Sequence, residues 1–139
     1  MSSRTKSRKM ALDAIFAADM RKQNPSDLLD TTALTQTDRQ NQDEIVGYAR
    51  QIVAGVIDSH AEIDDRIASF SHKWSIDRMP AVDRAILRVA VWEILSNDEV
   101  PDGVAISEAV ALASEYSTEE SGVFVNGLLS AISNTRTAR

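Results

Sequence analysis

The chain has 139 residues and no cysteine, which is enough sequence for one domain. The missing thiols exclude disulfide bonds, thiolate nucleophiles and cysteine-ligated zinc. A net charge of −6 argues against a protein that binds nucleic acid over its whole surface. No apolar run approaches the roughly 20 residues of a membrane span, and the beginning of the chain lacks the apolar core of a secretory signal. We therefore expect a single cytoplasmic domain over residues 1–139, without contact to a membrane.

The charge is unevenly distributed along the chain. Arg4, Lys6, Arg8 and Lys9 give residues 1–12 a charge of +4 with no acid, so the remaining residues sum to −10. This pattern predicts a basic arm, residues 1–9, on an acidic body. The first helix is expected over 5–23, apolar on most faces and hence largely buried. Its basic first turn is unfavourable beside the positive end of the helix dipole, and such local conflicts are typical of functional sites. A solvated N-terminus without a role is the alternative.

The middle of the chain predicts one long loop followed by two helices. Residues 24–41 are polar and contain Pro25, which indicates a loop with at most one helical turn around Leu28. Apolar residues at helical spacing predict helices over 42–59 and 61–70, with a short turn over 75–78. Gly55, inside the first of these, suggests close contact with another helix.

The last third predicts a buried central helix and two helices that pack against it. Residues 80–96 are apolar on nearly every side, as expected for the central helix of a bundle. A helix over 104–115 follows, and Ser117 with Glu120 forms a capping-box pattern for the final helix. Gly127 in that helix suggests a second close crossing. The fold class predicted from these elements is all-α.

No arrangement of side chains predicts catalysis or metal binding. His60 and His72 lie on different predicted elements, and neither has a glutamate or histidine three or four residues further on. The paired acids Asp64-Asp65 and Glu119-Glu120 are neighbours in a helix, where side chains point about 100° apart and do not converge on one substrate. We therefore expect no enzyme activity, no cofactor and no metal.

Four motifs in order and at characteristic spacing make the chain resemble the NusB family of bacterial transcription antitermination factors. They are Asp83-Arg84-Ala85-Ile86-Leu87-Arg88, Val100-Pro101, Val104-Ala105-Ile106-x-Glu108-Ala109 and Phe124-Val125-Asn126-Gly127. The basic-to-apolar opening from Ser7 to Phe16 is also similar, so the resemblance covers almost the whole chain. It implies a NusB-like fold in which two roughly perpendicular three-helix subdomains share a buried central helix. It further implies binding of boxA, a short single-stranded RNA element of ribosomal-RNA operon transcripts, together with NusE, a small-subunit ribosomal protein, in the RNA polymerase antitermination complex.

The resemblance also implies roles for individual residues. Arg4 and Arg8 stand where the family keeps arginines that meet RNA phosphate, and Lys6 and Lys9 lie in the same arm. Phe16 stands where some members have tyrosine, and it can either stack on a base or pack in the core. Glu120 and Phe124 match positions at or near the RNA surface; a cap for Glu120 and core packing for Phe124 are the alternatives. Asp83 matches an acid that the family presents to NusE, although an acid there also suits the helix N-terminus.

The chain departs from the family pattern in ways that should weaken its RNA affinity. Many members have a basic residue between Ser121 and Phe124, where this chain has Gly122 and Val123, and the arm has fewer arginines than in other members. Binding should therefore depend more on the partner. A protein–protein scaffold that no longer binds RNA, or a self-associating homodimer, remains an alternative function. The family's helical domain also precedes RNA-cytosine methyltransferase domains in larger proteins, but no Rossmann-like glycine motif is present here.

Overall fold

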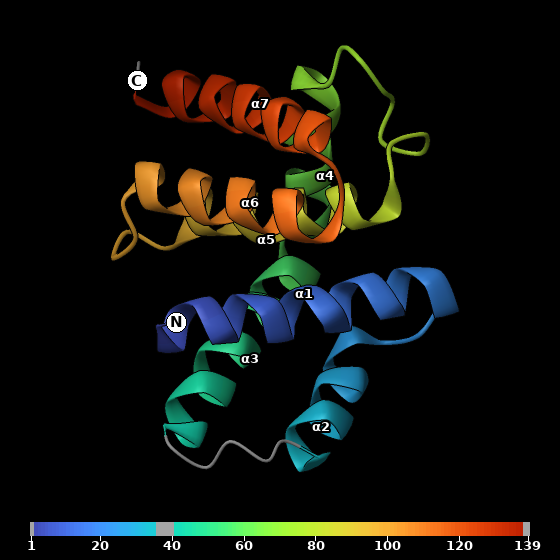
Figure 1. The fold of residues 1–139 in the computed structure, drawn as a ribbon, viewed down its shortest axis with the longest axis vertical. Helices are drawn as coiled ribbons and strands as arrows, with labels where there is room; N and C mark the ends of the chain where they lie inside the picture. Colours follow the sequence, from blue (N-terminus) through green and yellow to red (C-terminus); the bar gives the residue numbers. More distant parts are fainter. Residues whose placement is uncertain (1, 36–40, 138–139) are drawn as a thin grey trace.

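A computed structural model describes residues 2–35 and 41–137, and within these ranges the chain forms seven helices and no strand (Figure 1). The helices are α1 (Ser3–Arg21), α2 (Pro25–Thr35), α3 (Gln42–Asp58), α4 (His60–Phe70), α5 (Ala81–Ser96), α6 (Asp102–Tyr116) and α7 (Glu119–Thr137). The all-α prediction is confirmed, and most predicted helix ends lie within two residues of the observed ones.

The basic residues of the predicted arm all lie inside α1. The helix begins after Ser2, whose side-chain oxygen accepts a hydrogen bond from the backbone N–H of Thr5 at 3.1 Å. This is an N-cap, which supplies a partner for a backbone donor that the first turn leaves unpaired. No acid occupies that first turn. The helix ends at Arg21 and is followed by Lys22, a non-glycine residue in the left-handed region with φ of 56°.

The predicted loop over residues 24–41 is wrong from Pro25 to Thr35, which form α2. Asn24 caps this helix, since its side-chain oxygen accepts a hydrogen bond from the backbone N–H of Ser26 at 2.8 Å. Pro25 then occupies the first helical position, where its fixed φ and missing N–H suit a helix start. Leu29 is buried in the core. The Asn-Pro pair therefore starts a helix instead of interrupting one; residues 36–40 of the predicted loop lie outside the described residues.

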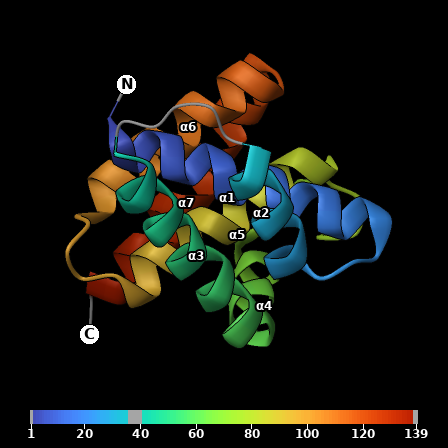
Figure 2. The ribbon, with the colours of Figure 1, turned by 90° about the horizontal axis from the view of Figure 1, so that it is seen from below.

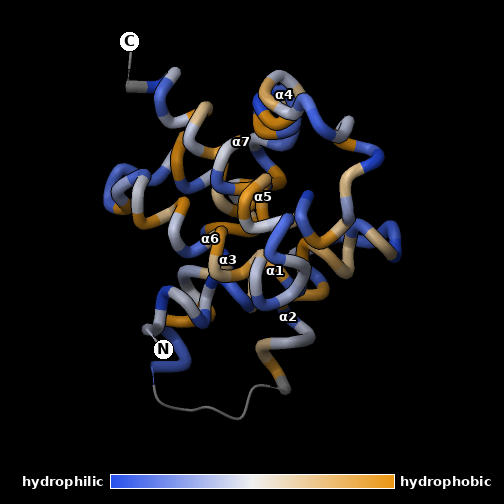
Figure 3. Tube along the Cα trace, turned by 45° about the horizontal axis from the view of Figure 1, so that its top comes forward, coloured by the Kyte–Doolittle hydropathy of each residue, from blue (hydrophilic) through white to orange (hydrophobic). Residues whose placement is uncertain are grey.

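The helices form two groups that meet at α5. In Figure 1, α1, α2 and α3 make the lower group, while α4, α6 and α7 surround α5 in the upper group. Seen from below in Figure 2, α1 and α3 lie across α5, and both helices contact it. The hydrophobic segments in Figure 3 turn toward the middle of the molecule, where α5 lies. The predicted shared central helix is thus confirmed.

One close helix contact predicted from glycine is confirmed and the other is wrong. A Cβ atom on Gly55 would lie only 1.8 Å from Nε1 of Trp92, so α3 and α5 pack at a distance that requires glycine. A Cβ on Gly127 would meet no atom within 4 Å. The glycine of α7 therefore faces open space, and its helix crossing does not depend on it.

The predicted cap of the last helix is displaced by one residue. Thr118, not Ser117, caps α7: its hydroxyl oxygen accepts a hydrogen bond from the backbone N–H of Ser121 at 3.0 Å. The hydroxyl of Ser117 instead lies 2.9 Å from that of Ser121. Glu120 is consequently released from the predicted capping box, and its carboxylate contacts Lys73.

The described residues contain neither a membrane-spanning helix nor a cluster of metal ligands. None of the helices in residues 2–35 and 41–137 is both long and apolar enough to cross a membrane. The same part of the chain holds no group of three or more histidine, aspartate or glutamate side chains placed to bind a metal ion.

Candidate nucleic-acid interface

The four basic residues of α1 divide between the interior and the surface. Arg8 is only 3% exposed, and its guanidinium lies against α5 and α6. Arg4 lies at the surface, with 41% of its side chain exposed. Lys6 and Lys9 line a hollow on another side of the same helix. The start of α1 thus carries both one buried cation, Arg8, and three cations that reach the surface.

Arg8 is held by two carboxylates from distant parts of the chain. Its Nε donates to Oε1 of Glu93 at 2.9 Å and its Nη2 to Oε2 of the same residue at 3.0 Å, while Nη1 lies 3.1 Å from Oε1 of Glu108. Burial alone would lower the pKa of Arg8, but the hydrogen bonds and the charge of Glu93 hold that pKa above its ordinary value. Arg8 therefore remains charged, and its donors face the interior.

Glu93 also accepts a hydrogen bond from the hydroxyl of Tyr48, which in turn accepts one from the side-chain amide of Asn97 at 3.0 Å. Desolvation, followed by the bond to Glu93, raises the pKa of Tyr48 to about 12. This cluster of Arg8, Glu93, Tyr48 and Asn97, hereafter the polar junction, joins α1, α3 and α5. Arg8, which the resemblance assigns to RNA phosphate, thus lies in the interior of this structure.

Arg4 lies above the polar junction at its solvent side. The centre of its guanidinium is 4.1 Å from the centroid of the Tyr48 ring, and Nη2 lies 3.2 Å from Oε2 of the exposed Glu99. The cation–π contact holds the guanidinium of Arg4 over the Tyr48 ring, while 41% of the side chain stays exposed. An exposed ion pair such as Arg4–Glu99 exchanges readily for another anion, because it contributes at most about 1 kcal/mol.

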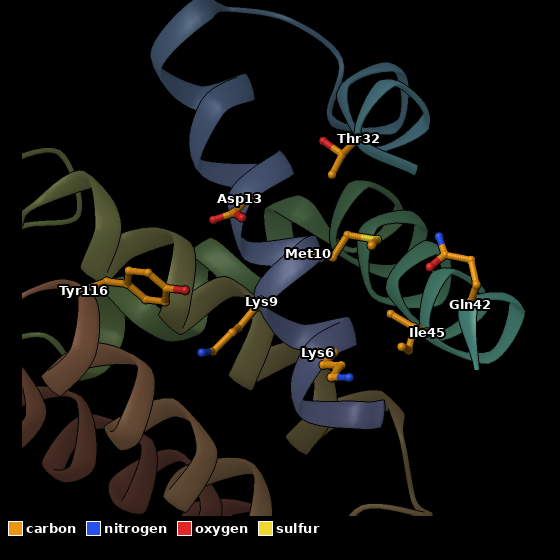
Figure 4. A pocket seen from close by; sticks show the side chains of 8 residues that line it. All are labelled: Lys6, Lys9, Met10, Asp13, Thr32, Gln42, Ile45 and Tyr116. Atoms are coloured by element: carbon orange, nitrogen blue, oxygen red, sulfur yellow. The ribbon is translucent and has the colours of Figure 1, made fainter. Parts of the chain in front are cut away.

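Lys6 and Lys9 line an open hollow of about 320 Å³ between α1, α2, α3 and the end of α6 (Figure 4). Lys9 Nζ donates to Glu115 Oε1 at 3.0 Å and lies 5.8 Å from the centroid of Tyr116. The hydrogen bond to Glu115 raises the pKa of Lys9, so the amine remains protonated at neutral pH. Asp13 and Tyr116 line this hollow and also an adjoining one of about 450 Å³.

Phe16 lines the adjoining hollow and is partly buried against the core. The structure therefore brings Lys6, Lys9 and Phe16 to neighbouring hollows that share Asp13 and Tyr116. Partial desolvation raises the pKa of Asp13, and the nearby Lys9 opposes that shift. Cations, aromatic rings and a hydrogen-bond acceptor are the groups that contact phosphates and unstacked bases of single-stranded RNA.

Glu120 and Phe124 lie on α7, next to the connection between α4 and α5. Glu120 contacts Lys73, and the Phe124 ring packs edge-on against Trp74 with the ring centroids 4.9 Å apart. Both side chains retain exposed surface. Core packing and surface exposure are thus combined at Phe124.

A comparison with known families covers nearly all of these residues. The sequence profile of the NusB family matches residues 5–134. The chain is 51% identical over 136 residues to the transcription antitermination protein NusB of Leifsonia xyli subsp. xyli, covering 98% of this chain and 94% of that protein. The chain belongs to the NusB family. The corresponding protein of Nocardioides sp. is 48% identical over 132 residues, with 95% and 94% of the two chains covered.

Solved structures of the family have the same fold. The NusB structure from T. maritima matches with a TM-score of 0.87 and 32% identity, over 96% of this chain and 92% of that one. A crystal structure of the antitermination factors NusB and NusE in complex with dsRNA matches with a TM-score of 0.84 and 29% identity. That match covers 97% of this chain and 98% of the other.

Asp83, the acid that the resemblance assigns to contact with NusE, is buried in this structure. Asp83 is 0% exposed, and neither carboxylate oxygen has a hydrogen-bond partner among the described residues. Position 83 lies in the first turn of α5, the helix that the other helices surround, so its first turn is covered. A lysine side chain at this position would have to enter the core, so Asp83→Lys should destabilise the fold.

Sequence reasoning missed a second set of ion pairs that braces the two helix groups. Arg84 Nη2 lies 2.7 Å from Oδ2 of Asp19 in α1, and Arg88 Nε lies 2.9 Å from Oδ1 of Asp64 in α4. Arg84 also donates to the backbone carbonyl of Ile76 at 2.9 Å. Arg84 and Arg88 are four residues apart and therefore lie on one face of α5. This spacing is the only sequence signal for the two ion pairs, and it does not show which helices supply the acids.

Proposed function

We propose that this protein is a non-enzymatic transcription antitermination factor that binds boxA-type single-stranded RNA jointly with NusE. The observation that carries the proposal is 51% identity to a transcription antitermination protein NusB over almost the full length of both chains. A second support is the likeness to NusB crystallised with NusE and dsRNA. The RNA would belong to ribosomal-RNA operon transcripts, and the protein would act in the cytoplasm as part of the RNA polymerase antitermination complex.

The outer cations of α1 supply the electrostatic part of RNA binding in this proposal. Arg4, Lys6 and Lys9 would each meet a phosphate, whereas Arg8 would position the helix through Glu93 and Glu108. Three contacts with a single strand correspond to a salt slope of about −2, since each contributes about 0.7. Such binding is weak alone, so a second RNA-binding protein on the same strand raises the affinity. Phe16 would offer a ring to an unstacked base.

Fluorescence anisotropy with a labelled boxA-like RNA tests the proposal, with and without NusE and with a scrambled RNA of equal length. We expect weak binding by the protein alone, a marked gain with NusE, and preference for the boxA-like sequence. The variant Lys6→Ala plus Lys9→Ala should reduce the salt slope by about 1.4, at ~0.7 per lost contact. A protein that binds NusE but no RNA, with or without the partner, would instead be a scaffold; self-association that abolishes RNA binding would point to a storage homodimer.

A further inference from the structure

Two consecutive residues between α4 and α5 contact the α7 face that carries Glu120 and Phe124. Lys73 pairs with Glu120, and Trp74 packs its ring against Phe124 with an interplanar angle of 73°. Glu120 and Phe124 are four residues apart in a helix, so they lie on one face, one turn above the other. The connection between α4 and α5 therefore runs along this face of α7, and an RNA strand that reaches Glu120 and Phe124 also reaches Lys73.

The charge of this face makes Lys73 important. Glu119 and Glu120 occupy the first turn of α7, and no basic residue follows before Phe124. A polyanion that approaches the start of α7 alone would meet two carboxylates. Lys73 brings a cation to this face from another part of the chain, 47 residues from its acidic partner.

Lys73 is held in a form that can exchange partners. Its Nζ lies 4.6 Å from the centroid of the Trp74 ring, which orients the ammonium group without removing it from solvent. The side chains of Lys73 and Glu120 are 46% and 67% exposed. An ion pair this exposed adds little to folding, so a phosphate can replace the carboxylate at small cost.

We propose that Lys73 is an RNA phosphate contact that supplies, from the connection between α4 and α5, the cation absent at positions 122 and 123. Trp74 is its positioning residue, because it contacts both the ammonium group and the Phe124 ring. The inference rests on the proposed RNA-binding function. It extends the RNA surface beyond α1. In the described ion pairs the α1 cations pair with Glu99, Glu108 and Glu115, and none of them pairs with the connection between α4 and α5.

The test compares Lys73→Met with Arg50→Ala in the full chain, using the labelled RNA and NusE. Methionine keeps the apolar stem on Trp74 and removes the charge. Arg50 is the matched control, since its ion pair with Asp30 is similarly exposed, at 51% and 53%, and lies on α3 and α2. We expect Lys73→Met to reduce the salt slope by about 0.7. When salt is lowered from 1 M to 0.1 M, the affinity of the variant should therefore rise about fivefold less than that of the wild type. Lys73→Arg should retain both, and Arg50→Ala should change neither.

Trp74 fluorescence gives an independent reading, because the other tryptophan, Trp92, is 9% exposed in the core. RNA should change the emission of the wild type and leave that of Trp74→Phe nearly unchanged. Wild-type binding with an undiminished slope in Lys73→Met would overturn the inference while leaving the proposed function intact. Equal losses in Lys73→Met and Arg50→Ala would also overturn it, since they would reflect overall charge. Absence of RNA binding by the wild type with NusE would instead reject the proposed function.

Discussion

At the scale of residues, burial separates cations that look equivalent in sequence. Arg8 differs from Arg4 because two carboxylates, 85 and 100 residues away, enclose it. A buried charge that loses its partner destabilises the fold strongly, whereas an exposed pair adds little. The position of a basic residue in an arm therefore does not decide whether it meets solvent, and its partners must be known.

Arg8→Met should reduce the free energy of unfolding by about 3–5 kcal/mol, because it leaves Glu93 buried without its cation. The matched change Arg4→Met removes an exposed ion pair and should cost at most about 1 kcal/mol. Urea denaturation followed by circular dichroism measures both. Adding Glu93→Gln to Arg8→Met should recover part of the loss, because the neutral side chain no longer needs a counter-charge. Equal losses in the two single variants would contradict the structural role of Arg8.

The sequence could predict the types of most site residues but not their surroundings. The charge run of residues 1–12 placed Arg4, Lys6 and Lys9 together with Arg8 in one basic arm, yet nothing local marked Arg8 or Asp83 as interior. Burial at both positions is produced by α5 and its neighbours, which are distant in sequence. Lys73 carried no signal at all, since a single lysine in a polar connection gains meaning only from its contact with Glu120.

At the scale of elements, apolar periodicity located six helices, because each buries one or more faces in a common core. The seventh, α2, was missed because Asn24-Pro25 reads as a loop signal, although the same residues form an N-cap and first position. Glycine inside a helix predicts a close helix crossing at both positions, and this prediction is correct at Gly55 and wrong at Gly127. Local sequence shows that glycine is tolerated, while only the neighbouring helix shows that it is required.

The same substitution at these two glycines should have opposite effects. Gly55→Ala places a Cβ 1.8 Å from Trp92 Nε1 and should destabilise the protein by about 1–3 kcal/mol through overpacking. Gly127→Ala meets open space within α7 and should stabilise it by about 0.5–1 kcal/mol through helix propensity. Thermal melts of the two variants beside the wild type provide the measurement. A loss of stability in both would show that the α7 backbone also needs glycine.

At the scale of the whole molecule, the polar junction connects the two helix groups. Arg8 comes from α1, Tyr48 from α3 and Glu93 from α5, while Glu108 of α6 closes the cluster on its outer side. Apolar packing alone would hold these helices together, but hydrogen-bonded charges require one relative position. The junction thereby fixes α1, and with it the outer cations, against the second group.

The raised pKa of Tyr48, about 12 against an ordinary value of 10, predicts a dependence of stability on alkaline pH. The unfolded chain loses the phenol proton near pH 10, while the folded protein retains it until about pH 12. The stabilisation is therefore complete below pH 10 and lost between pH 10 and 12, by about 2–3 kcal/mol. Urea unfolding at pH 9 to 12 measures the loss, and Tyr48→Phe is the control. A parallel decline in wild type and Tyr48→Phe would show that other groups cause it.

The separation of Arg8 from Glu93 along the chain has a consequence for synthesis. The two residues are 85 positions apart, and ribosomes add roughly 5–20 residues each second. About 4–17 s therefore pass between the translation of Arg8 and that of Glu93, its buried counter-charge. During that interval the nascent helix presents unpaired charge beside hydrophobic surface, which is the kind of segment that chaperones bind. The α1 segment proposed to meet RNA is thus translated well before α5, and its final position is set only when α5 has been made.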